Sequence, residues 1–573
     1  MFDINYTKNN NTELFKSLED NDVMKPQNYI PLYKNFFDLS SHNFNKINLN
    51  QHFKLENVES FDNKNKFKCK ILSNGKITEK ISFFKFSPLL DPTKFMVGKY
   101  QNLSQEQLTS LPTFDNNICH KKLLNIHNTA YVDSFFSYLS SKVLLEHKVL
   151  HGIDFYGSFL GIKENFSMNI YDDLEYLTDS TFFTENCNKL FKIENIENIY
   201  YNNSTRTNLK RLDMTNSENV ILNLDEIKSE DFDTVFQSCA LSNPSDYSAN
   251  IIFEYDNQKG GNAKKSSIKS SLSECSSNSS HTSHDSQSRS QIDSDIDSEF
   301  PSEDEEDEED EEEEDEEDEE EEYIEAKLFN FPVQIISLEN LDNTLDSFLT
   351  NESRLGDDEW CSCLFQIIMT LIIYQHMFDF THNDLHTSNI MFKKTDKQYL
   401  YYKYDKIHYK VPTFGKIWKI IDFGRAIYKF KGKRLCSDSF HKSGDAASQY
   451  NCEPFLNKNK PRLEPNKSFD LCRLGCSLFD YFEDNSEYGK SDVAKLITNW
   501  CKDDKGRNIL YKTNGDERYP EFKLYKMIVR TVHRYTPQKQ IKEHLFKKFQ
   551  TNKKKINNKT NILNVDNLPS YVN

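Results

Sequence analysis

Three polar residues in two short segments have the types and spacing that phosphoryl transfer requires. Asp384 and Asn389 belong to the segment 381–392, Thr-His-Asn-Asp-Leu-His-Thr-Ser-Asn-Ile-Met-Phe. Asp422 belongs to the segment 420–426, Ile-Ile-Asp-Phe-Gly-Arg-Ala, at the end of an expected strand. One carboxylate can take the proton of an acceptor hydroxyl, while an amide oxygen and a second carboxylate hold Mg²⁺ on phosphates. We therefore assign Asp384 as the candidate base, and Asn389 and Asp422 as candidate metal ligands.

The stretch before Asp384 must supply the element that positions this residue. Its apolar pattern predicts one long buried amphipathic helix over residues 357–380. Its longest apolar run, Leu364 to Phe380, carries Gln366, Gln375, His376 and Asp379. These residues disfavour a membrane-spanning helix, so we expect no membrane partner.

Strand and helix patterns follow one another in the first part of the chain. Alternating apolar and polar residues predict three strands, at 52–61, 66–73 and 80–87. Asn74-Gly75 is a strong hairpin turn signal between the second strand and the third. A helix is expected at 128–148, and a pair of strands is expected within 151–163.

An insert of different composition lies between these elements and the next expected strand, at 333–341. Residues 257–325 are first Gly- and Lys-rich, then Ser-rich, and end in twenty consecutive acidic residues at 303–322. Such a sequence cannot bury a core, so we expect it to be disordered. A short helix is expected at 344–349, after the strand.

The net charge of −19 depends on this insert. Removing its 24 acidic residues from 293–322 leaves 66 acidic against 71 basic residues, a net charge of about +5. The sequence therefore predicts a mildly basic body that carries one very acidic segment. We expect this segment to bind basic proteins or the basic surface of its own chain, and no nucleic-acid partner is expected.

The order of these segments resembles the protein-kinase superfamily. The family's catalytic loop is similar to 381–392 and its metal-binding loop to 420–426. Asp470 and Gly475 match the start of the family's central helix, where a buried aspartate holds the catalytic-loop backbone. Residues 401–426 look like the divergent kinase-like proteins of giant DNA viruses. The resemblance implies a serine/threonine protein kinase that uses ATP and Mg²⁺ on protein substrates.

The resemblance also implies an α+β fold of two lobes. A small antiparallel β lobe with one helix would span 46–340, interrupted by the disordered insert at 257–325. A larger, mainly helical lobe would span 341–545. Residues 1–45 would then be an N-terminal extension, and residues 546–573 a basic polar tail.

Candidate nucleotide-binding residues follow from the same resemblance. Lys85 lies among apolar residues on the third expected strand and would bind the phosphates. Its partner on the helix at 128–148 would be Asp133 or Glu146, and the small and apolar neighbours of Asp133 favour that residue. Glu339 and Leu341 would contact the nucleotide at the hinge, and Asn389 and Asp422 would complete the site.

The sequence departs from the family pattern at several places. No Gly-x-Gly-x-x-Gly motif occurs, although the first hairpin turn near 62–65 would normally approach phosphate closely. Asn383 stands where many kinases have an arginine that pairs with a phosphorylated activation segment, here expected at 425–455. His386 stands where serine/threonine kinases usually have lysine, and resembles haspin-like and aminoglycoside-phosphotransferase-type kinases.

These departures leave two further interpretations open. A pseudokinase that acts as a binding scaffold is favoured by the missing glycines and opposed by the intact Asp384, Asn389 and Asp422. A small-molecule kinase is suggested by His386 and opposed by the Asp-Phe-Gly sequence that begins at Asp422. An active protein kinase is the interpretation that uses all the candidate residues.

Cysteine usage and the first residues indicate the compartment. The twelve cysteines include no Cys-x-x-Cys pair and no cluster with zinc spacing, which is typical of a reducing environment. Residues 1–11 lack the apolar core of a signal peptide. With the viral resemblance, we expect an intracellular protein, in the cytoplasm of a host cell or packaged in a virion.

Overall fold

The computed structural model gives the α+β class that the sequence predicts. It describes residues 2–9, 11–63, 65–115, 118–194, 324–350, 354–484, 491–520, 522–558 and 560–573. The predicted disordered insert at 257–325, with its Ser-rich and acidic sequences, therefore lies outside the described residues except for its last two positions.

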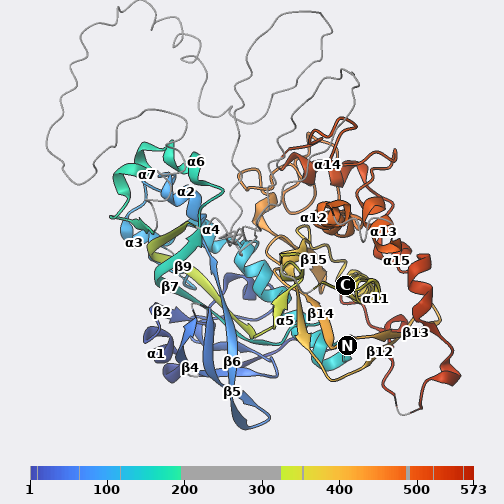
Figure 1. Ribbon diagram of the computed structural model, residues 1–573. Coiled ribbons are helices and arrows are strands. Elements are labelled where there is room, and N and C mark those ends of the chain that lie inside the picture. The colour runs from blue at the N-terminus through green and yellow to red at the C-terminus, as the bar shows by residue number, and fades with distance from the viewer. Residues whose placement is uncertain are drawn as a thin grey trace, which may run out of the picture. The chain divides into compact units, whose positions relative to one another are not determined.

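The main sheet is antiparallel and curled, and seven strands of the described chain form it (Figure 1). Its strands in spatial order are β2 (Val23–Gln27), β7 (Phe155–Asn169), β9 (Glu325–Glu339), β6 (Lys76–Pro88), β5 (Lys66–Ser73) and β4 (Lys54–Asn63). The short strand β8 (Phe191–Ile193) also pairs with β9. The central strands β9 and β7 supply most of the buried apolar side chains of the sheet, since both faces of β9 are covered.

The predicted strands at 52–61, 66–73 and 80–87 are confirmed as β4, β5 and β6. Strand β6 begins earlier than expected because the turn at Asn74-Gly75 closes the hairpin at once. Asn74 and Gly75 have φ angles of 49° and 74°, the left-handed conformation that a tight hairpin needs.

The expected pair of strands within 151–163 is wrong, because β7 runs without a break from Phe155 to Asn169. A side chain at Gly161 would collide with Val23 of β2, so glycine lets the two strands pack closely.

Two boundaries expected from the sequence differ in the structure. Strand β9 already begins at Glu325, well before the expected start at 333, so the insert must end before 325. Residues 1–45 contribute β2 to the main sheet, although Pro26 and the absence of alternation gave no strand signal. They also contain α1 (Thr12–Glu19) and β1 (Tyr6–Lys8), which pairs with β3 (Ile47–Leu49).

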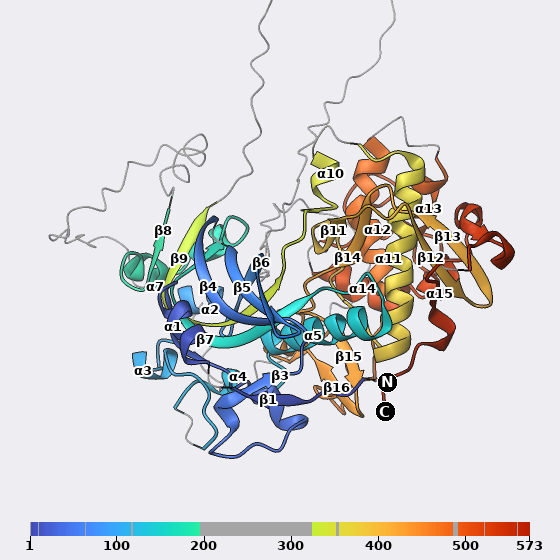
Figure 2. The same ribbon diagram turned by 90° about the horizontal axis from the view of Figure 1, so that it is seen from below.

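The predicted helix at 128–148 is confirmed as α5 (Thr129–His147). The Asn128 side chain accepts a hydrogen bond from the Ala130 amide at the N-terminus, and Lys148 ends the helix in a left-handed conformation. Figure 2 shows α5 between the curled sheet and the long helix α11 (Asp357–Phe378). The Ser140 and Tyr374 hydroxyls, 2.7 Å apart, join α5 to α11.

Helix α11 confirms the predicted buried helix before Asp384 and is surrounded by protein. Among the described residues it is the one helix that is long and apolar enough to cross a membrane. Its most apolar window is 94% buried, however, as expected for the central helix of a folded core.

Further helices and small sheets pack around α11. The helices on this side are α10 (Ser347–Thr350), α12 (Phe469–Asp484), α13 (Asp492–Trp500), α14 (Lys523–Thr531) and α15 (Pro537–Gln540). The small sheets contain β10 (Asn343–Thr344), β11 (Ile390–Lys394), β14 (Lys416–Ile420), β12 (Tyr399–Tyr404), β13 (Ile407–Pro412), β15 (Ile427–Phe430) and β16 (Lys433–Cys436). Shorter helices beside the main sheet are α2 (Pro92–Met96), α3 (Gln105–Leu108), α4 (Lys121–Leu124), α6 (Leu174–Thr178) and α7 (Thr181–Asn186).

Residues 546–573 are folded onto this part of the protein. Strand β17 (Gln550–Thr551) pairs with β13, and β18 (Leu563–Asn564) pairs with β12. The two ends of the chain meet, as Figure 1 shows, with the rings of Phe2 and Tyr571 stacked 4.2 Å apart.

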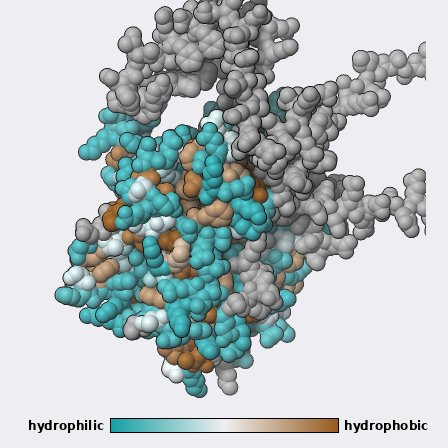
Figure 3. Space-filling view, turned by 90° about the vertical axis from the view of Figure 1, so that its left-hand side faces the viewer, coloured by the Kyte–Doolittle hydropathy of each residue, from teal (hydrophilic) through white to brown (hydrophobic). Residues whose placement is uncertain are grey.

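Side chains at the surface are mostly polar. On the face that Figure 3 shows, hydrophobic residues form small patches among hydrophilic ones. The large exposed apolar side chains of the described residues are Ile77, Ile81, Ile118, Tyr171, Tyr176, Tyr399 and Phe414. The described cysteines are all free, and most of them are buried.

Candidate functional site

A cavity of 1510 Å³ brings together most of the residues that the sequence singles out. It lies between strands β6, β7 and β9 on one side and the segments 388–391 and 421–424 on the other. The candidate residues that line it are Lys85, Asp133, Glu339, Leu341, Asn389 and Asp422. Asp384, in the same described segment as Asn389, is not part of this lining.

Lys85 contacts two carboxylates inside the cavity. Its Nζ atom lies 2.7 Å from Asp133 Oδ2 and 2.7 Å from Asp422 Oδ1. The partner expected on α5 is therefore Asp133, while Glu146 pairs with Lys142 at 3.0 Å. Strand β6, helix α5 and the segment after β14 thus converge on one ammonium group.

Burial and the nearest opposite charge shift the pKa values of this cluster in opposite directions. Burial by itself lowers the pKa of Lys85, but the charges of Asp133 and Asp422 together raise it above the usual value. Burial raises the pKa of Asp133, as does Asp422, and Lys85 opposes this change. The ammonium group therefore holds together two carboxylates that would repel each other without it.

Asp133 also fixes the segment that carries Asp422. Its Oδ1 atom accepts a hydrogen bond of 3.0 Å from the Phe423 amide. The ring of Phe423 is buried against Phe136 of the same helix, with centroids 4.7 Å apart. Asp422 itself has a φ of 60°, a strained conformation for a residue with a side chain, which such contacts must maintain.

The segment with Asp384 is held by a buried aspartate of α12, as the resemblance implies. The Asp470 carboxylate accepts hydrogen bonds from the His382 and Asn383 amides, at 3.0 and 2.9 Å. The His382 ring continues this link, because Nδ1 accepts from the Asp384 amide and Nε2 donates to the Ile421 carbonyl at 2.9 Å. The two segments with candidate chemistry are therefore joined directly.

Asn389 and Asp384 lie in one loop but use their side chains differently. The Asn389 amide nitrogen donates to the Asp384 carbonyl at 2.9 Å and lies 3.0 Å from His386 Nε2. Its Oδ1 atom is therefore the end of the amide that can face a cation. The Asp384 carboxylate accepts a hydrogen bond from the Tyr525 hydroxyl at 2.8 Å, and Arg425 Nη1 lies 3.6 Å from its other oxygen.

Asn383 is buried and ties the loop to the segment after Asp422. Its amide nitrogen donates to the Arg425 carbonyl at 2.9 Å, and its oxygen accepts from the Tyr450 hydroxyl at 2.6 Å. It has a φ of 66°, which asparagine tolerates better than most residues. An arginine at 383 could not reproduce these short contacts.

Glu339 and Leu341 lie at the end of β9, where the sequence predicts a hinge. The Glu339 carboxylate pairs with Lys419, and its amide donates to the Asp154 carbonyl at 2.9 Å. Burial, and then the charge of Glu339, raise the pKa of Asp154 to about 6. Both polar ends of Glu339 therefore have protein partners, and its nucleotide contact stays a prediction, as does that of the buried Leu341.

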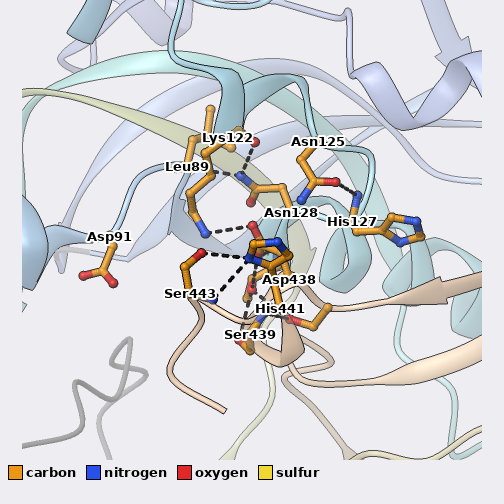
Figure 4. A network of polar contacts seen from close by, with 12 residues as sticks. Leu89, Asp91, Lys122, Asn125, His127, Asn128, Asp438, Ser439, His441 and Ser443 are labelled. Atoms are coloured by element: carbon orange, nitrogen blue, oxygen red, sulfur yellow. Dashed lines mark hydrogen bonds and ion pairs between the residues drawn. The ribbon is translucent and has the colours of Figure 1, made fainter. Parts of the chain in front are cut away.

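A network that the sequence does not reveal fixes the N-terminus of α5. The buried carboxylate of Asp438 pairs with Lys122 at 2.8 Å (Figure 4). Its Oδ1 atom accepts from both the amide and the hydroxyl of Thr129, each at 3.0 Å. The Asp438 amide in turn donates to the His127 carbonyl at 2.7 Å. The first turn of α5 is thus bound to the segment that contains Asp438, which only the β15–β16 hairpin separates from Asp422.

Comparison with known proteins adds no assignment. No family model matches the chain, and no curated protein matches it. Among the described residues, no group of three or more His, Cys, Asp and Glu side chains could hold a metal ion.

Two residues of the site were missed by the sequence prediction, Asp438 and Tyr525. Tyr525 lies 141 positions from Asp384. Asp438 is near Asp422 in the chain, but it contacts Thr129, 309 positions away. Neither belongs to a local motif, so only the tertiary structure identifies them.

Proposed function

We propose that the protein is an ATP- and Mg²⁺-dependent protein kinase with two lobes, which transfers phosphate to serine or threonine. The observation that carries the proposal is the contact of Lys85 with both Asp133 and Asp422 at 2.7 Å. It joins a strand lysine, a helix acid and an Asp-Phe-Gly aspartate, the three groups that the family places around the nucleotide phosphates. The main sheet with α5 would form the small lobe, and the helices around α11 the large one.

The residues of the cavity suit a magnesium nucleotide. Carboxylate and amide oxygens are the ligands that Mg²⁺ prefers, and Asp422 and Asn389 supply one of each. When bound, Mg²⁺ would neutralise charge on the phosphates. Lys85 supplies a second positive charge, and the buried Asp133 keeps its ammonium group in place.

The proposed reaction needs one base and no covalent intermediate on the protein. Asp384 accepts the proton of the acceptor hydroxyl as the new oxygen–phosphorus bond forms. The bond between the γ-phosphorus and the bridging oxygen breaks, and ADP leaves with that oxygen. The acceptor side of the site therefore contains Asp384, and the donor side contains Lys85, Asn389 and Asp422.

A nucleotide-binding scaffold without catalysis is the second candidate. The sequence between β4, which ends at Asn63, and β5, which begins at Lys66, contains no glycine. Backbone amides of that turn would approach phosphate less closely than those of a glycine-rich loop. The anchored Asp384 favours the active kinase over this candidate.

Binding of ATP with and without Mg²⁺ tests the proposal on the donor side. Asp422→Asn should remove the Mg²⁺-dependent part of ATP binding, because a metal ligand is lost. Asp405→Asn is the matched control, since Asp405 pairs with Lys542 at the exposed surface. Calorimetric titration of the wild-type protein that detects no Mg²⁺-ATP binding would refute both the kinase and the scaffold.

A further inference from the structure

The Asp384 carboxylate is held by a short chain of hydrogen bonds that begins on α12. Arg473 Nε donates to the Tyr525 hydroxyl oxygen at 2.8 Å. The Tyr525 hydroxyl lies 2.8 Å from Asp384 Oδ1. Arginine can only donate, so the tyrosine oxygen accepts from Arg473 and its one proton points to Asp384. The direction of both hydrogen bonds is therefore fixed by chemistry.

The Tyr525 ring has little freedom to move. It is 7% exposed and stacks on Phe522, with centroids 5.2 Å apart and planes 21° apart. The guanidinium groups of Arg473 and Arg425 lie 5.3 and 5.7 Å from the ring centroid, within range of a cation–π interaction. The hydroxyl of Tyr525 is thus presented to Asp384 from a rigid support.

The support for this loop comes largely from one helix, α12. Asp470 binds the backbone at His382 and Asn383, and Arg473, one turn further along, acts through Tyr525 on the Asp384 side chain. Burial lowers the pKa of Arg473, but Tyr525 and Asp384 outweigh this and raise it, so the guanidinium group stays charged. Backbone and side chain of the candidate base are fixed together.

We propose that Tyr525 is a positioning residue for Asp384, supported by Arg473; the inference rests on the proposed kinase function. By holding Oδ1, the hydroxyl orients the carboxylate so that Oδ2 receives the proton of the acceptor. The ATP cavity does not include Tyr525. The residue therefore acts on the transfer step and not on nucleotide binding.

The variant Tyr525→Phe removes one hydroxyl and keeps the ring. We expect kcat to fall about tenfold or more, because a hydrogen bond to a charged group is lost, while the KM for ATP stays unchanged. A merely structural role would not lower kcat while the KM for ATP stays unchanged.

Tyr511→Phe is the matched control. The Tyr511 hydroxyl donates to Asp480 Oδ1 at 2.9 Å, the same chemical pair at an exposed site. This variant should keep the wild-type kcat and the wild-type KM for ATP. Arg473→Met should lower kcat in the same direction as Tyr525→Phe, because it removes the donor that orients the Tyr525 proton.

Three outcomes would overturn the inference. An unchanged kcat in folded Tyr525→Phe would mean that the hydroxyl only fills space. A raised kcat would mean that Tyr525 occupies the place of the acceptor hydroxyl and blocks it. A wild-type protein that transfers no phosphate would refute the proposed function and the inference with it, whereas the first two outcomes leave the proposed function intact.

Discussion

Lys85 Nζ lies 2.7 Å from Asp422 Oδ1, so the candidate phosphate ligand and the candidate metal ligand neutralise each other across the cavity. Asp133 holds the same ammonium group from the other side, also at 2.7 Å. Under the proposed function, a magnesium nucleotide that binds Asp422 would compete with Lys85. The lysine would then turn to the phosphates and keep its contact with Asp133, so Asp133 would be the fixed point of the site.

Lys85→Met should weaken Mg²⁺-ATP binding by about tenfold to a hundredfold, because a charge-assisted contact to phosphate is lost. The measurement is the Kd for Mg²⁺-ATP, with the melting transition checked in parallel. Lys68→Met on the neighbouring strand is the control, since Lys68 pairs with the exposed Glu79 outside the cavity. Normal affinity in a folded Lys85→Met protein would remove Lys85 from the site.

Asp438 lines the cavity, and Asp438→Asn should loosen the N-terminus of α5 while Lys85, Asp133 and Asp422 keep their side chains. The change removes the charge that pairs with Lys122 and favours the helix N-terminus, with an expected loss of about 1–2 kcal/mol of stability. Amide hydrogen exchange should become faster over the first turn of α5, and the KM for ATP should rise several-fold as Asp133 moves. Asp405→Asn, which loses an exposed ion pair, should change neither quantity.

Activity should not require phosphorylation within 425–455. The side chain of Asn383 is buried and hydrogen-bonded to Arg425 and Tyr450. Asp438 already supplies a carboxylate at the start of α5. Treatment with a phosphatase should therefore leave the rate of phosphate transfer unchanged. A large loss of activity that maps to a phosphorylated residue in this segment would contradict the prediction.

The sequence predicts elements that depend on local signals better than contacts between residues that lie far apart in the chain. Strand β5 and helix α5 follow from local alternation, a turn signal and a cap. The contact of Lys85 with Asp133 was expected from the family resemblance and from the small and apolar neighbours of Asp133. The expected pair of strands within 151–163 was wrong, because this stretch belongs to one continuous strand whose Gly161 packs closely against β2. The start of β9 was hidden by the acidic run directly before it.

The parts of the site that the sequence could not predict are single residues from remote elements. Tyr525 and Asp438 are an ordinary helix residue and an ordinary loop residue until the fold brings them to Asp384 and Thr129. Residues 23–27 become a strand only because β7 offers an open edge. No periodicity or motif in one sequence encodes such pairings.

The buried ring of His151 should make stability depend on pH. Its Nδ1 donates to the Trp418 carbonyl at 2.8 Å and its Nε2 accepts from the Tyr402 hydroxyl at 2.7 Å. Burial lowers the pKa of His151 to about 4, with Lys419 adding to the effect and the hydrogen bond to Trp418 opposing it. Between pH 6.5 and 4, His151 is therefore protonated in the unfolded chain but neutral in the folded protein. Acidification in this window lowers the free energy of unfolding.

The variant His151→Gln lacks this titrating group, so a comparison with the wild-type protein isolates the contribution of His151. The free energy of unfolding of the wild-type protein, relative to that of the variant, should fall by about 2 kcal/mol between pH 7 and pH 5. Asp154, whose pKa of about 6 acts in the opposite sense, is present in both proteins and cancels. Urea denaturation at the two pH values checks this, and a constant difference would mean that His151 is protonated in the folded state.

The most direct test of the kinase assignment is the rate of transfer of labelled γ-phosphate from Mg²⁺-ATP to a mixed Ser/Thr peptide library. It compares the wild-type protein with Asp384→Asn, and the Kd for Mg²⁺-ATP is measured on both proteins. We expect the variant to bind nucleotide normally and to transfer phosphate about 10²–10⁴-fold more slowly, the range for a lost general base. Equal rates in the two proteins, or no transfer by either, would contradict the assignment of Asp384 as the base of a protein kinase.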